Sequence, residues 1–246
     1  MGLFDFFRSK PERAVPEKIR LGIPSNLTGR YDAATITSQN AKHWVNADGQ
    51  SADSAASGSV RQTLRNHARY EVANNTYAKG IVTTLANDTI GSGPRISVQT
   101  LDPRADRVIE AEWNRWTKAI NLAEKLRVMR MARAESGEVF AVFVSNPSVP
   151  SPIKLDLILV EADRVTNFDA LPSDSEVDGI KFDSFGNPES YRILKYHPGD
   201  TTGGSDDAQV LPAEQVIHYF NPTRPGQNRG VPDIAPALPL FAQLRR

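Results

Sequence analysis

Histidines, neighbouring carboxylates and rows of arginine are the residues of this sequence whose types and spacing could do chemistry. The histidines stand apart, and none forms an H-x-x-x-H or E-x-x-H pair of the kind that binds a metal ion. Glu161 and Asp163 lie close together, but carboxylates at the end of a strand more often meet arginine or solvent than a metal. We therefore expect no metal site, and we interpret each histidine as a satisfied core or surface residue. The four are His43, His67, His197 and His218.

Nucleophile and phosphate-loop motifs are also missing from the sequence. There is no cysteine and no G-x-S-x-G elbow for a serine nucleophile. Gly91-Ser-Gly93-Pro94 follows a helical pattern instead of a strand, and no Gly-Lys-Ser/Thr comes after it, so we interpret it as a helix stop. We expect no catalytic residue, no cofactor and no enzymatic activity. A hydrolase or nuclease whose site forms only in the folded chain stays open as an alternative.

Two rows of basic side chains allow two interpretations. A solvated helix face is the usual meaning of such a row. The alternative is contact with DNA phosphates, which would be independent of base sequence and weakened by salt. Arg127, Arg130 and Arg133 are the candidates for that contact. The rows are Arg61, Arg65 and Arg69 in one predicted helix and Lys125, Arg127, Arg130 and Arg133 in another.

The segment NPTRPGQNRGVPDIAP (221–236) combines flexible and stiff positions. Its glycines permit unusual backbone angles, and its four prolines hold the rest stiff. Its planar side chains can donate to carboxylates or to backbone carbonyls. Placed between a strand and a new helix, the segment predicts a structural joint or a subunit interface. The candidate residues are Arg224, Gln227, Arg229, Gly230 and Pro232.

Periodicity predicts helices first and strands afterwards. Apolar residues recur at three- and four-residue steps from Ser59 to Gly91, which predicts two helices with Asn75 capping the second. Asp102 is expected to cap a third helix that begins at Pro103, and Asn121 to cap a fourth that ends near Gly137. Helices followed by a mostly antiparallel sheet are typical of an α+β domain. The predicted strands cover 94–100, 138–144, 153–161 and 215–220, with a hairpin around SFGNPE (184–189) and a solvated loop over 201–209.

Composition is that of an ordinary globular chain. Apolar residues make up 39% of it and charged residues 24%, and 29 basic side chains balance 29 acidic ones, so a simple coat of nucleic acid is disfavoured. No stretch approaches the ~20 apolar residues that span a bilayer. We divide the chain into an arm with a flexible linker (1–58), an α+β domain (59–235) and the start of a further helix (236–246). Residues 1–30 and 46–58 are expected to be mobile because their composition cannot support burial.

Several segments together resemble portal proteins of the lambda family of tailed phages. The most specific is Arg224-Pro-Gly-Gln227-x-Arg229-Gly230-Val-Pro232-x-Ile-Ala-Pro236. The resemblance runs over nearly the whole chain, and one departure is Ser136, where relatives often show Asp. The other matching segments, in order, surround Tyr31, Trp44 and Ser51-Ala-Asp53 in the arm, and then comprise RYEVANNTYAKGIVTTLANDTIGSGPRI (69–96), SGEVFAVFV (136–144) and LILVEADRV (157–165).

The resemblance implies a structural role in the virion. A family portal is a dodecameric ring at one vertex of the capsid, is not itself an ATPase, and passes double-stranded DNA through its channel during packaging and ejection. It docks the terminase and meets the major capsid and head-tail connector proteins, after assembly in the host cytoplasm. Residues 59–235 would then be the wing domain. A binding module that interferes with assembly by joining portal rings is a further alternative.

The resemblance also gives a meaning to the last predicted helix, which starts at Leu238. In the family, the helix after the Arg-Gly-x-Pro segment leads to the stem, clip, tunnel helix and crown, so the chain resembles the N-terminal fragment of a phage or prophage portal. Helices shorter than ~12–15 residues are marginal in water. We therefore expect this one to fray, exposing Leu240, Phe241 and Leu244, and we expect the chain alone to be monomeric or loosely associated.

Overall fold

The computed structural model describes residues 31–34, 36–167, 175–200 and 207–245. The chain divides into two units, residues 1–49 and residues 50–246. In the first unit, the described part holds two short 3-10 turns, Asp32–Ala34 and Ala41–His43. Residues 1–30, which we expect to be mobile, lie outside the described residues.

The second unit contains the predicted helices in the predicted order. The Asn75 side chain accepts from the backbone N–H of Tyr77 and Ala78 and so caps α3, as the sequence predicts. Asp102 caps α4 in the same way by accepting from Arg104 N at 2.8 Å. The helices are α1 (Ala52–Ala55), α2 (Gly58–Asn74), α3 (Thr76–Ile90), α4 (Pro103–Ala119), α5 (Leu122–Ser136) and α6 (Leu238–Leu244).

The residue at which α5 begins is predicted correctly, but the expected side-chain cap at Asn121 is not formed. Asn121 precedes the helix with φ 53°, in the left-handed region, and its side chain makes no capping hydrogen bond. Asparagine is one of the few residues that visit this conformation readily. Asn121 therefore begins α5 through its left-handed backbone conformation and not through a hydrogen bond of its side-chain amide.

Part of the predicted linker forms regular structure. Ser51 caps α1 by accepting from Ser54 N, and Ala52 is buried. Asp53 accepts from the backbone N–H and the side-chain amide of Asn228, at 2.9 and 2.6 Å. The small, polar residues of 51–55 are fixed by a distant loop, which a composition argument does not detect. The linker assignment is therefore wrong for this stretch.

The strands form two sheets, and every pairing among the described residues is antiparallel. The first sheet has the order β2-β1-β7 and the second the order β3-β4-β5-β6. Helices together with antiparallel sheets confirm the α+β class. The strands are β1 (Glu138–Ser145), β2 (Leu155–Glu161), β3 (Glu176–Val177), β4 (Ile180–Phe182), β5 (Pro188–Leu194), β6 (Ala208–Pro212) and β7 (Val216–Phe220).

One predicted strand and one predicted loop differ from the structure. Residues 94–100 form no strand, because Val98 N donates to the Glu110 carboxylate of α4 and not to a neighbouring strand. The strand β6 was not predicted, and it begins inside the loop expected over 201–209, of which residues 201–206 lie outside the described part. It pairs with β5 from Ser190↔Pro212 to Leu194↔Ala208.

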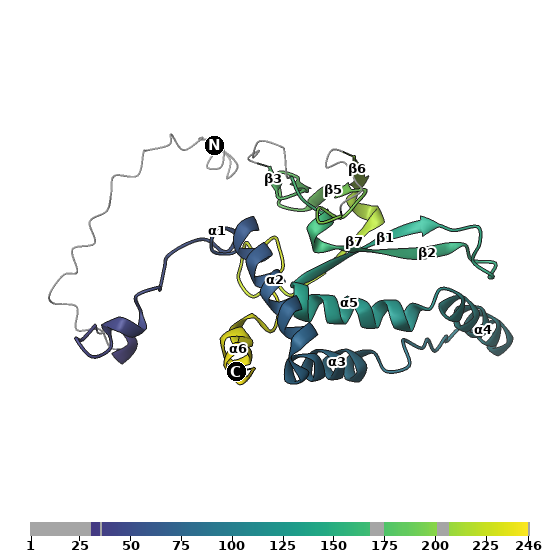
Figure 1. The fold of residues 1–246 in the computed structure, drawn as a ribbon. Coiled ribbons are helices and arrows are strands. Elements are labelled where there is room, and N and C mark those ends of the chain that lie inside the picture. Colours follow the sequence, from purple (N-terminus) through teal and green to yellow (C-terminus); the bar gives the residue numbers. More distant parts are fainter. Residues whose placement is uncertain (1–30, 35, 168–174, 201–206, 246) are drawn as a thin grey trace. The chain divides into compact units, whose positions relative to one another are not determined.

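The first sheet is enclosed between helix and sheet. On one face, Val139 and Ala141 of β1 pack against Met129 of α5. On the other face, Phe140 packs against Tyr191 of the second sheet. Figure 1 shows α5 running between the first sheet and α3. β1 is therefore buried on both faces, which explains its continuous apolar sequence.

The terminal helix α6 packs on α2 and α3. Leu238 and Phe241 are buried in a cluster with Ala68 and Val82. The Asn75 amide donates to Phe241 O at 3.1 Å. The exposure that we expected for Phe241 is therefore wrong, whereas Leu240 and Leu244 are exposed. Arg245 adds an ion pair to Glu71 at 2.7 Å.

Gly80 offers a stabilising substitution in α3. It lies in the helix interior, and a Cβ built on it would have nothing within 4 Å. Alanine has a higher helix propensity than glycine by roughly 0.8–1.0 kcal/mol. We expect Gly80→Ala to raise the free energy of unfolding by about that amount in a urea titration. A decrease would show that α3 contacts something at this position.

Candidate functional site: a buried ion-pair junction

A carboxylate at the start of β1 forms the centre of the site. Glu138 and Arg229 are 0% and 1% exposed, and they lie 91 residues apart in the chain. Arg229 Nε donates to both carboxylate oxygens at 3.0 Å, and Nη2 donates to Oε1 at 2.7 Å. Such a forked, charge-assisted contact is among the stronger hydrogen-bonding arrangements in proteins.

Glu138 has further partners on both of its oxygens. Gly230 N donates to Oε2 at 2.8 Å, and His218 Nε2 of β7 lies 2.8 Å from the same atom. Since the ionised carboxylate can only accept, His218 donates through Nε2. The His218 ring also stacks between Phe140 and Phe220, each with a centroid distance of 4.3 Å.

The Arg229 guanidinium also binds backbone carbonyls from other parts of the chain. Nη1 donates to Val165 O at 3.1 Å and to Asp178 O, and Nη2 donates to Ala162 O at 3.3 Å. These carbonyls belong to the connections after β2 and before β4. One side chain therefore joins the first sheet to the loops that carry the second.

Arginines of α2 extend the same network. Arg61 is buried and pairs with Asp178, and it also donates to Ala56 O. Arg65 is buried with its Nε 3.3 Å from Asp163 Oδ1 and its Nη1 3.7 Å from Glu138 Oε1. The interpretation of this row as a solvated helix face is therefore wrong for Arg61 and Arg65. Arg69, one turn further, donates to Asp163 at 2.8 Å.

Two glycines let the segments approach closely enough for this network to form. A Cβ built on Gly230 would lie 2.2 Å from Gly137 O and 2.7 Å from the Cβ of Glu138. A Cβ built on Gly137, whose φ is +90°, would lie 2.7 Å from the carbonyl carbon of Val231. The residues before Glu138 and after Arg229 are thus in direct backbone contact.

The charges of the junction set the pKa values of its members. Burial alone would raise the pKa of Glu138, but the charge of Arg229 and the hydrogen bonds from His218 and Arg229 hold it well below its usual range. Burial lowers the pKa of His218, against the opposing effect of Glu138. The pKa of Arg229 is raised, because Glu138 outweighs the effect of burial. The site therefore holds an ionised Glu138 next to a neutral His218.

We expect this junction to make the fold sensitive to acid. Both His218 and Glu138 have folded pKa values below the unfolded ones, so the stability they contribute is present above the unfolded pKa and is lost as pH falls. The unfolded values of ~6.5 and ~4.3 place the two losses below those points. Thermal unfolding from pH 8 to 2 should show both, the loss from His218 below ~6.5 and the loss from Glu138 below ~4.3. His218→Gln keeps a donor but does not titrate, so it should remove the decline that starts near pH 6.5; an unchanged profile would contradict this assignment.

Other residues of 221–236 form hydrogen bonds within the same loop or to its neighbours. Arg224 donates to Gln50 O at 2.9 Å and is exposed. Gln227 accepts from Thr223 N and donates to Arg229 O. Pro232 is buried. The structure thus places Arg229, Gly230 and Pro232 in the interior and Arg224 at the surface. A role of these residues as a structural joint or subunit interface stays a prediction.

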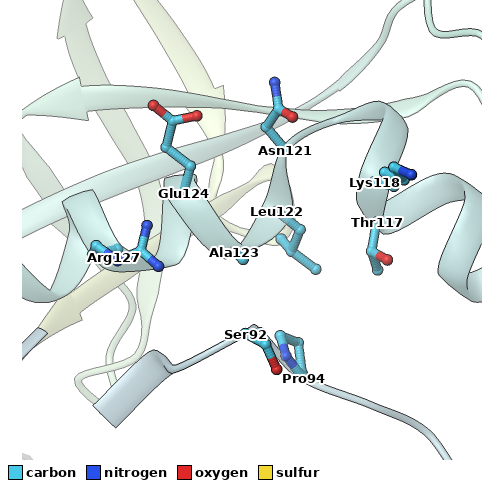
Figure 2. A pocket seen from close by; sticks show the side chains of 10 residues that line it. Ser92, Pro94, Thr117, Lys118, Asn121, Leu122, Ala123, Glu124 and Arg127 are labelled. Atoms are coloured by element: carbon cyan, nitrogen blue, oxygen red, sulfur yellow. The ribbon is translucent and has the colours of Figure 1, made fainter. Parts of the chain in front are cut away.

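The candidates for phosphate contact do not share one open surface. Arg130 and Arg133 both pair with Asp233, at 3.2 and 3.3 Å. Arg127 is half-buried and donates to Gly91 O at 3.2 Å. It lines a pocket of about 360 Å³ at the start of α5, where Lys118 and Glu124 also lie (Figure 2). Two of the three guanidinium groups thus have an internal carboxylate partner, and DNA contact by them stays a prediction.

One group of side chains could hold a cation by distance alone. Glu161, Asp163 and His197 each offer a ligand atom, and these atoms lie within 4.8 Å of one another. However, His197 Nδ1 accepts from Gly199 N at 2.9 Å, so in the neutral ring Nε2 carries the proton and has no free lone pair. Arg69 Nη2 already binds both carboxylates, at 3.1 and 2.8 Å. These residues form an ion-pair cluster that does not fit a metal ion.

Comparison with known proteins identifies the family of the chain. The family described as "Phage portal protein, lambda family" matches residues 37–246. The chain belongs to this family. A "Probable portal protein" of Halomonas phage phiHAP-1 is 29% identical over 189 residues, and the match covers 69% of this chain and 36% of that protein. The chain thus spans about a third of the length of this curated relative. Among the described residues, no helix is both long and apolar enough to cross a membrane.

Proposed function

We propose that the chain is a structural subunit of a phage portal ring, contributing its wing domain to the capsid vertex through which DNA is packaged and ejected. The match of the portal family to residues 37–246 carries this proposal. The ring would be dodecameric, would dock the terminase, and would contact the major capsid and head-tail connector proteins, as in the family. The protein would reach the virion after assembly in the host cytoplasm.

The buried junction gives the wing a mechanical role in this proposal. Glu138 and Arg229 join β1 to the loops before β4, and Arg61 and Arg65 join the same point to α2. In such a ring, we expect each subunit to keep its shape while DNA passes. A network with its charges paired in the interior resists such change, because any opening leaves a buried charge without a partner.

Labelling of the virion tests the proposed function. An antibody against residues 50–246, carried on gold, should mark a single vertex of particles that have been opened by osmotic shock. Particles that lack the protein, and therefore the epitope, are the control for background gold label. Label spread over the whole shell, or label on the tail alone, would contradict the proposal.

The rival function, a divalent-dependent nuclease, would have to bind its cation at Glu161, Asp163 and His197, whose ligand atoms lie within 4.8 Å of one another. We expect the purified protein to leave plasmid DNA intact in Mg²⁺ and in Mn²⁺, because Arg69 binds both carboxylates. Cleavage that disappears in Asp163→Asn would establish the nuclease and overturn this expectation.

A further inference from the structure

An exposed apolar stripe runs along α3. Tyr77, Ile81 and Leu85 recur at four-residue spacing, so they share one face of the helix, and they are 68%, 45% and 37% exposed. The adjacent face holds the buried residues of α3. Asp88 follows Leu85 by one turn on the exposed face, and its carboxylate has no partner among the described residues. The stripe is therefore apolar over two turns and acidic at its carboxyl end.

A second unpartnered face lies on α4. The carboxyl half of this helix packs on the body, where Trp116 is buried and its Nε1 donates to Leu155 O at 2.7 Å. The amino half leaves Val108 and Ile109 62% and 46% exposed, and Leu101, just before the helix, is fully exposed. Contiguous exposed apolar side chains of this kind mark interaction sites more often than isolated ones.

The charged side chains on the amino half of α4 differ in whether they have hydrogen-bond partners. The acidic ones hold the preceding chain: Glu110 accepts from Val98 N, and Asp106 accepts from Thr100 N, both at 2.9 Å. The basic ones, Arg104 and Arg107, are exposed, and their guanidinium groups have no partner among the residues that the structure describes. The free charge of this face is therefore positive, opposite to that of Asp88 on α3.

The two faces are complementary when α3 of one chain and α4 of another run antiparallel. The acidic carboxyl end of α3 then lies beside the basic amino end of α4, and Leu85 and Ile81 meet Val108 and Ile109. Figure 1 shows α3 alongside α5, and α4 beyond the amino end of α5, so the faces belong to different parts of the subunit. A contact between two different faces of one chain is heterologous, and a repeated heterologous contact forms a ring when the rotation between neighbours closes.

We propose that the exposed face of α3 in one subunit binds the amino half of α4 in a second copy of the chain, with Asp88 beside Arg104. The inference rests on the proposed function, because it names a contact by which portal subunits would join. In this proposal the exposed face of α3 and the amino half of α4 bind each other, and neither binds a capsid or tail protein. Salt should weaken the contact, since its charged pair lies at the surface.

Disulfide trapping tests the contact, and the cysteine-free chain gives a clean background. Leu85→Cys and Val108→Cys are made as separate proteins, mixed and oxidised. A disulfide dimer that joins the two proteins is expected in roughly tenfold excess over a control mixture. The control is Lys79→Cys with Asn114→Cys, exposed positions of which Lys79 lies on the side of α3 opposite the stripe and Asn114 lies in the carboxyl half of α4. Trapping no greater than the control would overturn the contact, while leaving the labelling of the capsid vertex unaffected.

The double variant Leu85→Cys/Val108→Cys distinguishes the symmetry of the contact. A heterologous contact should give a ladder of trimers and larger species. A product that stops at dimers would show a reciprocal pairing and would overturn the proposed direction.

Charge exchange then tests the pairing of Asp88 with Arg104. Asp88→Arg and Arg104→Asp should each lower the yield of trapped product about fivefold, as expected for loss of a surface pair of up to 1 kcal/mol. The two changes combined should restore it. Equal yields in all four proteins would contradict the proposed register.

Discussion

Gly230→Ala is expected to lower the free energy of unfolding by about 3 kcal/mol or more. The added Cβ would lie 2.2 Å from the carbonyl oxygen of Gly137, and this neighbour is backbone that cannot turn away. Relief of the overlap requires that the two segments separate. Separation would also pull Gly230 N from Glu138, to which it donates at 2.8 Å. Urea unfolding followed by circular dichroism measures the change.

Gly226→Ala is the matched control in the same loop. Gly226 has φ +74°, and a Cβ on it would have nothing within 4 Å. Its substitution should therefore cost only the strain of a left-handed backbone, about 1 kcal/mol. If the two substitutions lowered the free energy of unfolding equally, the backbone angle would explain why both positions are glycine, and the close approach of two segments would not.

Arg229→Met is expected to cost about 3–5 kcal/mol, because it leaves the Glu138 carboxylate buried without its cation. The replacement keeps most of the side-chain length, so the loss would come mainly from charge and hydrogen bonds. Arg61 and Arg65 remain near the carboxylate, but Arg65 lies 3.7 Å away, too far to replace a forked contact. Thermal unfolding at pH 7 measures the change.

Arg224→Met is the control for this substitution. Arg224 is an exposed arginine of the same loop, and its side chain has a single described hydrogen bond, to Gln50 O. Its loss should change stability by less than about 0.5 kcal/mol. A cost at Arg224 as large as that at Arg229 would contradict the assignment of stability to the buried pair.

Local signals in the sequence predict most elements of the fold. Asn75 and Asp102 are capping residues whose side chains act within three residues, so their role can be inferred without tertiary structure. The continuous apolar run that becomes β1 is likewise visible. The strand expected over 94–100 fails because its sequence pattern fits a strand, whereas Glu110 binds its backbone from α4.

The junction could not be predicted from the same signals. Glu138 begins an apolar strand, and nothing in its neighbourhood shows that its partner is 91 residues away. Arg61 and Arg65 have the spacing of a solvated row, yet both are buried. The only local signals are Gly137 before Glu138 and Gly230 after Arg229, each consistent with a close approach of backbone.

The geometry of the junction explains one motif of the sequence. Arg229-Gly230-x-Pro232 is part of the segment on which the resemblance of the sequence to lambda-family portals rests, and its arginine and glycine both bind Glu138. The predicted joint at this segment can therefore be stated as named contacts. Arg229 would join parts of one chain, and any contact between subunits by this loop would fall to exposed residues such as Arg224.

A double-mutant cycle on Glu138 and Arg229 tests the central claim most directly. Glu138→Gln, Arg229→Met and the combined variant are unfolded in urea at pH 7, in the Gly80→Ala background if more stability is needed. Because each single change leaves one buried group without its partner, the combined loss should be smaller than the sum of the single losses by at least about 2 kcal/mol. Losses that add to within about 0.5 kcal/mol would show that the two residues act independently, and would contradict the junction as the structural centre of residues 50–246.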